Sequence, residues 1–466
     1  MRHILYSSIL RAKLFKFLFS TLTPFIWLIY SSIFFGCTNT KTTTTIAKDP
    51  SIYRQDALAY VTKDIAQGIS DSNQEEVLRQ KLMESYLKEY FSPWISMRPN
   101  NNINEVFWVK NSILKNPGFG MNRLPNTPKS MQAIWQAMNI KDYPSALDFA
   151  IVTESSAVRA IPSDMPRFSD PDDYPFDQWQ NSLIFANTPI LITHYDTSRQ
   201  WAHIQSGFVY GWIKVQHLAL IDEKDRSQFM ETKQFVIPYH DNIPLYDDNG
   251  NFLTIARMGQ IFGIQETLKE GYKVFVFKRD TQGKAQRITA KIQAADFAPF
   301  PRKFSHKISA EIINTMIGDQ YGWGGYLGYR DCSAFVRDIF ANFGLYLPRN
   351  SKSQAFFAKN LINLEQLSRE EKENYILKNA TPFGSILWLK GHIMLYIGEY
   401  KGKAMVAHSA WSVKTFRGSE KIKNMLGGVV ITSLYAGSEN NDSPSQHLLI
   451  DKILGISDLY AYMETL

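Results

Sequence analysis

The chain has 466 residues, which leaves room for about three domains after any leader segment. Hydrophobic residues make up 44% and charged residues 20% of the sequence, a balance that excludes a disordered or collagen-like chain. The formal net charge is +7, but the first 36 residues hold four basic residues and no acidic one. The remainder has 47 basic residues against 44 acidic ones, which gives no indication of a nucleic-acid partner.

The N-terminus has the form of an export signal. Basic residues up to Lys16 precede an apolar stretch from Phe17 to Phe35, and Gly36-Cys37 follows. A cysteine directly after a small residue resembles the lipobox of bacterial lipoproteins, which implies a signal over residues 1–37 and a lipidated Cys37. The apolar stretch is also long enough for an uncleaved transmembrane helix, which stays open as the alternative. With either anchor we expect an exported protein held at a membrane, facing the periplasm or the cell exterior.

The next two segments are predicted to be a tether and a helical domain. Residues 38–50 read as a flexible tether, because their Thr-rich sequence has almost nothing to bury. Residues 51–145 read as a helical N-terminal domain, with one helix that ends before Pro93 and a second from Met131 to Met138. The apolar residues of the first helix are spaced to line one face: Val77, Leu78, Leu82, Tyr86 and Phe91. No spacing in this domain indicates catalysis, so we interpret it as a structural or docking module.

Two β-rich stretches follow, predicted to form small SH3-like barrels over residues 146–226 and 227–300. Both consist of short apolar runs broken by Pro, Gly, Asp and Asn. The sequence Gly-Trp-Ile at 211–213 is similar to bacterial SH3-like domains, which bind cell-wall peptides or form lids over neighbouring sites. In the second stretch we expect a hairpin with strands Tyr272–Phe277 and Arg287–Ile292. A β-scaffold of unknown use is the alternative interpretation of both stretches.

The chain has only two cysteines, Cys37 and Cys332. If Cys37 carries a lipid, Cys332 is a lone thiol in an exported protein and a candidate reactive group. The alternative is a buried cysteine that packs as a small hydrophobe. Apolar residues recur after Cys332 with the spacing of one buried helix face: Phe335, Val336, Ile339, Phe340 and Phe343. Cys332 is therefore expected at or just before a helix N-terminus, where the backbone N–H groups and the helix dipole favour a thiolate.

Two histidines lie on predicted strands further along the chain. Alternation places His392 on one strand face with Met394 and Tyr396, and the next strand ends with His408. If these strands pair, His408 can hydrogen-bond the imidazole of His392 and fix its tautomer, so that His392 can act as a base toward Cys332. Alternatively, each histidine is structural.

A zinc site made of Cys332, His392 and His408 is a further alternative. However, the sequence has no CxxC or HExxH spacing, and a structural zinc ion normally takes four ligands. We therefore expect neither a metal nor another cofactor.

These motifs stand in an order that resembles one known family. They are Tyr-x-Trp-Gly-Gly from Tyr321, Asp-Cys-Ser from Asp331, Leu-Pro-Arg from Leu347, Gln354, and Gly-His-Ile-x-x-Tyr-Ile-Gly from Gly391. The order is similar to that of the NlpC/P60 family of papain-like cysteine peptidases, which cut the stem peptides of bacterial peptidoglycan. The resemblance implies an α+β fold with a papain-like catalytic domain over residues 301–466. The helical segment and two SH3-like barrels before it are similar to a multidomain subgroup of that family.

Carried over by position, the resemblance implies that Cys332 is the nucleophile, His392 the general base and acid, and His408 the residue that orients it. It also implies three substrate-binding residues: Tyr321, Asp331 and Ser333. The carboxylate of Asp331 would hold the free ammonium group of an N-terminal L-Ala. An SH3-like barrel would block longer, glycan-linked chains.

The expected function is that of a cell-wall hydrolase. The implied reaction is cleavage of the bond between γ-D-glutamate and a diamino acid (meso-diaminopimelate), by thiolate attack and hydrolysis of an acyl-enzyme. The alternatives are a catalytically inactive wall-binding lipoprotein and an acyltransferase or amidase on the same fold. The chain departs from the family pattern at Ala334, where Gly is common, and at Gly384-Ser385, where Gly-Asp is usual. The second departure puts a local turn or hydrogen bond in question.

Overall fold

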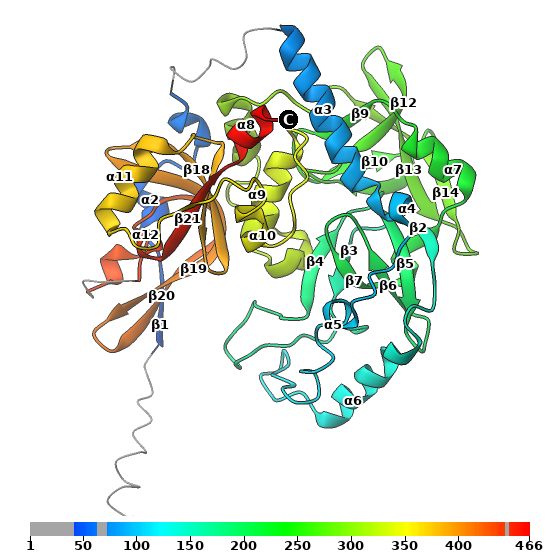
Figure 1. The fold of residues 1–466 in the computed structure, drawn as a ribbon, viewed down its shortest axis with the longest axis horizontal. Helices are drawn as coiled ribbons and strands as arrows, with labels where there is room; N and C mark the ends of the chain where they lie inside the picture. Colours follow the sequence, from blue (N-terminus) through cyan, green and yellow to red (C-terminus); the bar gives the residue numbers. More distant parts are fainter. Residues whose placement is uncertain (1–41, 63–71, 443–446) are drawn as a thin grey trace, which may run out of the picture.

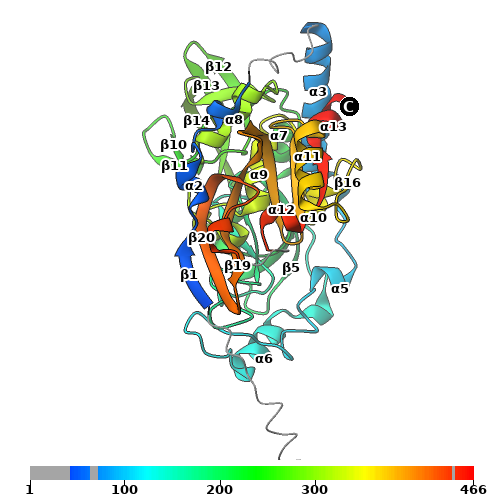
Figure 2. The same ribbon diagram turned by 90° about the vertical axis from the view of Figure 1, so that its left-hand side faces the viewer.

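The computed structural model describes residues 42–62, 72–442 and 447–466. The expected signal over residues 1–37, with Cys37, lies outside these ranges. No helix within the described residues is long and apolar enough to cross a membrane. Four parts follow one another along the chain: N-terminal helices, a first and a second β domain, and a C-terminal α+β domain (Figures 1 and 2).

The N-terminal part is mainly helical. Its elements are β1 (Thr42–Ile46), α2 (Asp49–Ile52), a 3-10 turn (Ala57–Tyr60), α3 (Ser72–Tyr90), α4 (Ser92–Ser96), α5 (Ile103–Val106) and α6 (Pro128–Ala137). Helix α3 runs from beside the C-terminus of the chain toward the β domains (Figure 1). Leu82 and Tyr86 are buried on its predicted face. Val77 is exposed, contrary to the prediction, whereas the next residue, Leu78, packs against the core of the C-terminal domain.

Residues 42–50 are not a free tether, and that part of the prediction is wrong. Strand β1 pairs in parallel with β20 (Glu420–Ser433), with Thr42 opposite Lys421. Asp49 is buried and accepts a hydrogen bond from the backbone N–H of Ser433 at 2.6 Å. The physical reason is that threonine favours extended backbone and the edge of β20 offers unpaired N–H and C=O groups. The rest of the predicted tether, residues 38–41, lies outside the described residues.

The first β domain contains β2 (Asp148–Val152), β3 (Ser156–Arg159), β4 (Gln180–Ile184), β5 (Pro189–Tyr195), β6 (Trp201–Gln205), β7 (Tyr210–Lys214) and β8 (Leu218–Leu220). Their order in the sheet is β4-β3-β7-β6-β5-β2-β8. A 20-residue connection joins β3 to β4. That connection reaches the C-terminal domain, as described below.

The second β domain contains α7 (Glu223–Met230), β9 (Phe235–Pro238), β10 (Ile243–Tyr246), β11 (Phe252–Ala256), β12 (Phe262–Leu268), β13 (Gly271–Arg279), β14 (Ala285–Gln293) and β15 (Phe297–Phe300). Its main sheet has the order β14-β13-β12-β9-β15, and β10 pairs with β11. The predicted hairpin is present in the expected register, with Tyr272 opposite Ile292 and Phe277 opposite Arg287.

The C-terminal domain packs helices on a mixed sheet. Its helices are α8 (His306–Asn314), α9 (Cys332–Ala341), α10 (Ser351–Ala355), α11 (Arg369–Asn379), α12 (Leu449–Lys452) and α13 (Leu459–Glu464). Its strands are β16 (Ile362–Asn363), β17 (Ser385–Leu389), β18 (His392–Tyr400), β19 (Lys403–Arg417), β20 and β21 (Ile453–Asp458), in the order β1-β20-β19-β18-β17-β21-β16. The alternation predicted for β18 is present, because Ile393, Leu395 and Ile397 share one core cluster while Met394 and Tyr396 belong to another.

One aromatic cluster joins all four parts. Its buried members come from α3 and α4, from both β domains and from the end of α9: Tyr86, Tyr90, Phe91, Trp94, Ile151, Ile221, Phe229, Phe235, Ile237, Ile261, Phe277, Ala298, Phe300, Ala341 and Tyr346. Hydrogen bonds add to it, since Tyr90 donates to the carbonyl of Asn187 at 2.7 Å. The orientation of the β domains relative to α9 is therefore set by a shared core.

Candidate active site

Cys332 is the first residue of helix α9, as predicted. The residue before it, Asp331, is the N-cap, and its side chain accepts a hydrogen bond from the backbone N–H of Ala334 at 2.9 Å. The predicted apolar face of α9 is fully buried and packs against β18 and β19. This packing holds the sulfur beside the start of β18, where the backbone N–H of Ile393 acts to lower the pKa of the thiol. Cys332 thus lies next to the residue that follows His392.

The thiol is held in its neutral form, contrary to the expected thiolate. Burial, together with the neighbouring Asp331 carboxylate, raises the pKa of Cys332 to about 12. The N–H groups of Ile393 and Ser333 and the guanidinium of Arg349 act in the opposite direction. Only 7% of Cys332 is exposed, so loss of solvation outweighs the helix N-terminus. An incoming carbonyl group must therefore meet a thiol whose proton is removed during the attack.

The two predicted histidines form a hydrogen-bonded pair. Nε2 of His392 and Nδ1 of His408 are 2.8 Å apart, because β18 and β19 are antiparallel neighbours. Nε2 of His408 lies 3.1 Å from Oγ1 of Thr432, which is on the next strand, β20. Thr432 was not identified from the sequence. It lies diagonally across the strand pair from His408, a relationship that requires the register of two strands.

This chain of contacts allows one tautomer that suits a base. With the proton of His392 on Nε2, His392 donates to His408, and His408 donates from its own Nε2 to Thr432. The Nδ1 atom of His392 then keeps its lone pair free to accept a proton. Burial lowers the pKa of His392 to about 4, and the pKa of His408 well below its usual value. Both imidazoles are therefore neutral in the resting protein.

Asp331 and Ser333 are brought together by a residue to which sequence reasoning gave no role. Arg349 forms a bidentate ion pair with Asp331, at 2.9 Å and 2.7 Å, and also donates to Ser333 Oγ at 2.7 Å. Burial alone would raise the pKa of Asp331, but the Arg349 guanidinium outweighs it and holds the pKa below its usual value. The backbone N–H of Gly324 donates to the same carboxylate at 3.0 Å. Asp331 is thus a charged and fully hydrogen-bonded group.

Tyr321 lies close to Cys332, Asp331 and Arg349, and its ring contacts the first β domain. Burial, together with the neighbouring Cys332 and Asp331, raises the pKa of Tyr321, so its hydroxyl stays protonated. Its ring contacts Phe176, which belongs to the connection between β3 and β4, and Trp411 on β19. The ring centroids are 6.2 Å apart in both pairs. The first β domain therefore forms one side of the candidate site.

Polar contacts fix this side in place. Trp323 Nε1 donates to the carbonyl of Asp177 at 2.8 Å, and Arg349 Nε donates to Ser182 Oγ at 2.8 Å. Gln180 Nε2 donates to the carbonyl of Gly324 at 2.9 Å. The sequence could not supply these contacts, because each joins positions more than 140 residues apart.

The departure at Gly384-Ser385 is accommodated locally. Ser385 Oγ accepts a hydrogen bond from the backbone N–H of Thr381 at 2.9 Å, which closes the turn before β17. Among the residues that the structure describes, no three His, Cys, Asp or Glu side chains are grouped so that they could hold a metal ion. The site thus has a buried thiol at the start of α9, close to the beginning of β18, and a hydrogen-bonded His392–His408 pair on β18 and β19.

Comparison with family models gives four matches along the chain. Residues 26–143 match an N-terminal NLPC_P60 stabilising domain, residues 166–214 an SH3 domain of SH3b1 type and residues 225–266 an SH3 domain of SH3b2 type. Residues 318–427 match the NlpC/P60 family and include the cysteine and both histidines. The predicted family resemblance and architecture are confirmed. The chain has no match among curated proteins.

Comparison with solved structures also gives matches. The chain is similar to an NlpC/P60 endopeptidase from Photobacterium damselae subsp. piscicida, with a TM-score of 0.76 and 26% identity, over 90% of this chain and 99% of that one. It is also matched to an NlpC/P60 family protein from Bacillus cereus, with a TM-score of 0.47 and 14% identity, over 67% of this chain and 99% of that one.

Proposed function

We propose that this protein, whose residues 318–427 match the NlpC/P60 family, is a cysteine endopeptidase that cleaves peptidoglycan stem peptides. We propose the bond between γ-D-glutamate and meso-diaminopimelate, in peptides with a free N-terminal L-Ala. The observation that carries the proposal is the hydrogen-bonded series His392–His408–Thr432 beside the start of α9. The similar Photobacterium protein is described as an endopeptidase, which adds support.

The proposed reaction begins with proton transfer. His392 takes the proton of the Cys332 thiol as the sulfur attacks the carbonyl carbon of the scissile amide. Because the resting thiol and imidazole are both neutral, this transfer accompanies the attack. We propose that the backbone N–H of Cys332, at the start of α9, stabilises the oxyanion that forms in this step.

The second half of the reaction reverses these roles. The imidazolium of His392 gives its proton to the leaving amine, and the C–N bond breaks to give a thioester on Cys332. His392 then removes a proton from water, which attacks the thioester and releases the γ-glutamyl carboxylate with the thiol restored. His408 stabilises the imidazolium and keeps its ring in position, since it accepts from Nε2 of His392.

Substrate recognition is proposed at Tyr321, Asp331 and Ser333. An L-Ala ammonium group at Asp331 would share the carboxylate with Arg349, whose guanidinium already occupies both oxygens. The connection between β3 and β4 stands beside Tyr321 and limits the length of peptide that fits. We therefore propose short, free stem peptides as substrates in preference to glycan-linked ones.

The location of the protein is part of the proposal. We propose that it is exported and anchored in a membrane by a lipidated Cys37 or by the apolar segment Phe17–Phe35, as the sequence indicates. Membrane fractionation of Cys37→Ser tests the choice. Release into the soluble fraction supports a lipid anchor, and continued tight membrane association contradicts it.

The test of the activity uses the full-length protein in detergent with L-Ala-γ-D-Glu-meso-diaminopimelate. Mass spectrometry should detect L-Ala-D-Glu and free diaminopimelate, and Cys332→Ala should abolish both products. An intact substrate with retained binding to wall sacculi would instead indicate an inactive binding protein. Addition of an amine acceptor separates hydrolysis from transfer, because an acyltransferase would convert the γ-glutamyl group to the amide of that acceptor.

A further inference from the structure

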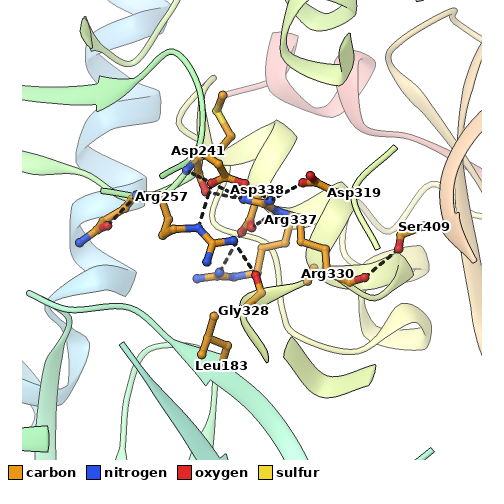
Figure 3. Close-up of polar contacts among 12 residues, drawn as sticks. Leu183, Asp241, Arg257, Asp319, Gly328, Arg330, Arg337, Asp338 and Ser409 are labelled. Atoms are coloured by element: carbon orange, nitrogen blue, oxygen red, sulfur yellow. Dashed lines mark hydrogen bonds and ion pairs between the residues drawn. The ribbon is translucent and has the colours of Figure 1, made fainter. Parts of the chain in front are cut away.

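A buried group of charges lies between the second β domain and the C-terminal domain. Asp241 and Arg257 come from the second β domain, and Arg330 and Asp338 come from the C-terminal domain (Figure 3). Arg330 donates to Asp338 Oδ2 at 2.8 Å, and both of its terminal nitrogens donate to Asp241. Arg257 Nε donates to Asp241 Oδ1 at 3.1 Å. The side chain of Arg330 is 3% exposed and that of Asp241 is 8% exposed, so water contributes little to their solvation.

These charges stabilise one another in place of water. Burial alone would raise the pKa of Asp241, but Arg330 and Arg257 outweigh it and hold the pKa well below its usual value. Burial alone would lower the pKa of Arg330, and here Asp241 and Asp338 raise it. Removing one partner leaves an uncompensated buried charge, which is strongly unfavourable. The ions therefore hold the two domains in one relative position.

Arg330 also organises the segment that leads to Cys332. It lies two residues before the cysteine, and its carbonyl accepts from Ser409 Oγ at 2.7 Å and from the backbone N–H of Gly322 at 3.0 Å. Ser409 directly follows His408 on β19, and Gly322 directly follows Tyr321. One residue thus connects the cysteine segment, the histidine strand and the turn that carries Tyr321.

The second β domain contacts both sides of this segment. Arg257 Nη2 donates to the carbonyl of Gly328 at 2.6 Å, and the carbonyl of Met258 accepts from Arg330 at 3.2 Å. The backbone of Gly259 lies directly against Asp338, where a Cβ atom would come within 3.0 Å of the Asp338 Cα. Residues 257–259 therefore pack against both the chain segment that precedes Cys332 and helix α9, which begins at Cys332.

We propose that Arg330 and Asp241 are positioning residues, which hold Cys332 in the arrangement that His392 and His408 require. The second β domain is then a structural part of the active site. The proposal deepens the proposed function, since the group that is positioned is the nucleophile of that function. It predicts that loss of the Asp241 charge slows the chemical step while the protein stays folded.

The first test compares Asp241→Asn with the unaltered full-length protein, at a temperature well below the melting temperature of both. We expect kcat for the tripeptide to fall at least tenfold while KM changes by less than twofold. We expect faster amide hydrogen exchange in residues 320–334, including the N–H of Gly322, which donates to the carbonyl of Arg330. Exchange in β13 and β14 should be unchanged. Asp241→Glu, which keeps the charge, should recover most of both signals.

Asp451→Asn is the matched control. Asp451 is likewise a mostly buried carboxylate in a bidentate pair, with Arg369, at 2.9 Å and 3.0 Å, but its partners lie on α11 and α12. The substitution Asp451→Asn should leave kcat and the amide hydrogen exchange of residues 320–334 unchanged. If Asp241→Asn does not fold, Arg330→Lys is measured in the same way, because lysine keeps the charge but cannot bridge both carboxylates.

The proposal is overturned if a folded Asp241→Asn or Arg330→Lys has the kcat and the local exchange of the parent protein. A loss of stability with exchange raised equally everywhere also overturns it, since that indicates a purely structural role. If the unaltered protein cleaves no stem peptide, the proposed function fails, and the exchange of residues 320–334 still decides whether Asp241 positions the cysteine segment.

Discussion

His392 and His408 are joined nitrogen to nitrogen at 2.8 Å, and His408 in turn contacts Thr432. The partner of His392 is therefore a second imidazole and not a negatively charged carboxylate. A neutral partner stabilises the imidazolium less than a carboxylate does, but it fixes the tautomer of His392 equally well. The pair therefore favours a base that stays neutral until the thiol proton arrives.

Replacement of His408 tests this relationship. In His408→Leu the Nε2 proton of His392 has no acceptor, and we expect kcat to fall about 10²-fold or more. In His408→Gln the amide oxygen can accept that proton, so a larger part of the activity should remain. Steady-state kinetics on both variants, with circular dichroism as the check on folding, decides the point. Equal activity of the Leu and Gln variants would contradict the orienting role.

The pH dependence of activity follows from the neutral pair. The base form of His392 is lost only as the pH falls through its pKa of about 4, because burial disfavours the charged ring. We expect kcat/KM to show its acid limb near pH 4 and to stay level between pH 5 and 7. Measurement of kcat/KM from pH 3.5 to 8 tests this. An acid limb near pH 6.5 would mean that His392 is as readily protonated as a solvated histidine.

Phe176 should limit the length of the substrate. Its ring contacts both Tyr321 and Trp323, with centroid separations of 6.2 Å and 5.2 Å, so it closes the site on the side of the first β domain. Phe176→Ala should raise the rate on glycan-linked stem peptides relative to the free tripeptide. Phe252→Ala, an exposed aromatic residue of the second β domain, is the control and should leave the ratio unchanged. A ratio that is the same in all three proteins would exclude this role for Phe176.

Asp49 offers a test of how the N-terminal segment docks. Burial raises the pKa of Asp49 to about 6. Above that pH the carboxylate is ionised in the folded protein, and its burial then lowers the free energy of unfolding. The protonated carboxyl group of Asp49 stabilises the folded state fully below the unfolded pKa near 4, and this stabilisation is lost as the pH rises through about 6. Asp49→Asn should therefore stabilise the protein at pH 8 by about 1–3 kcal/mol and have little effect near pH 4. Thermal melts at both pH values measure the difference, and destabilisation at pH 8 would show that the ionised carboxylate is the better partner for Ser433.

The sequence predicted those features that depend on local patterns. The buried face of α9 follows from a helical period after Cys332, and the pairing of β13 with β14 follows from two apolar runs around a short turn. The position of His392 relative to His408 required only that two adjacent strands pair. In each case the information lies within about 20 residues of chain.

Features that depend on distant partners could not be predicted. The strand at residues 42–46 pairs with β20, almost 380 residues away, and its threonines alone give no indication of that partner. The contact between Arg330 and Asp241 likewise joins two domains. The sign of the Cys332 pKa shift depends on how deeply the thiol is buried, which the helix N-terminus alone does not determine.

The aromatic cluster that includes Tyr86, Phe229 and Tyr346 has a practical consequence for work with fragments. A fragment that begins near residue 301 would keep only Ala341 and Tyr346 of the buried residues of this cluster and would expose the surface around them to water, and such an apolar surface promotes self-association. The whole assembly should melt in a single cooperative transition, without separate steps for its parts. Fragment expression is thus a poor way to study catalysis in this protein, and point substitutions in the intact chain are the better tool.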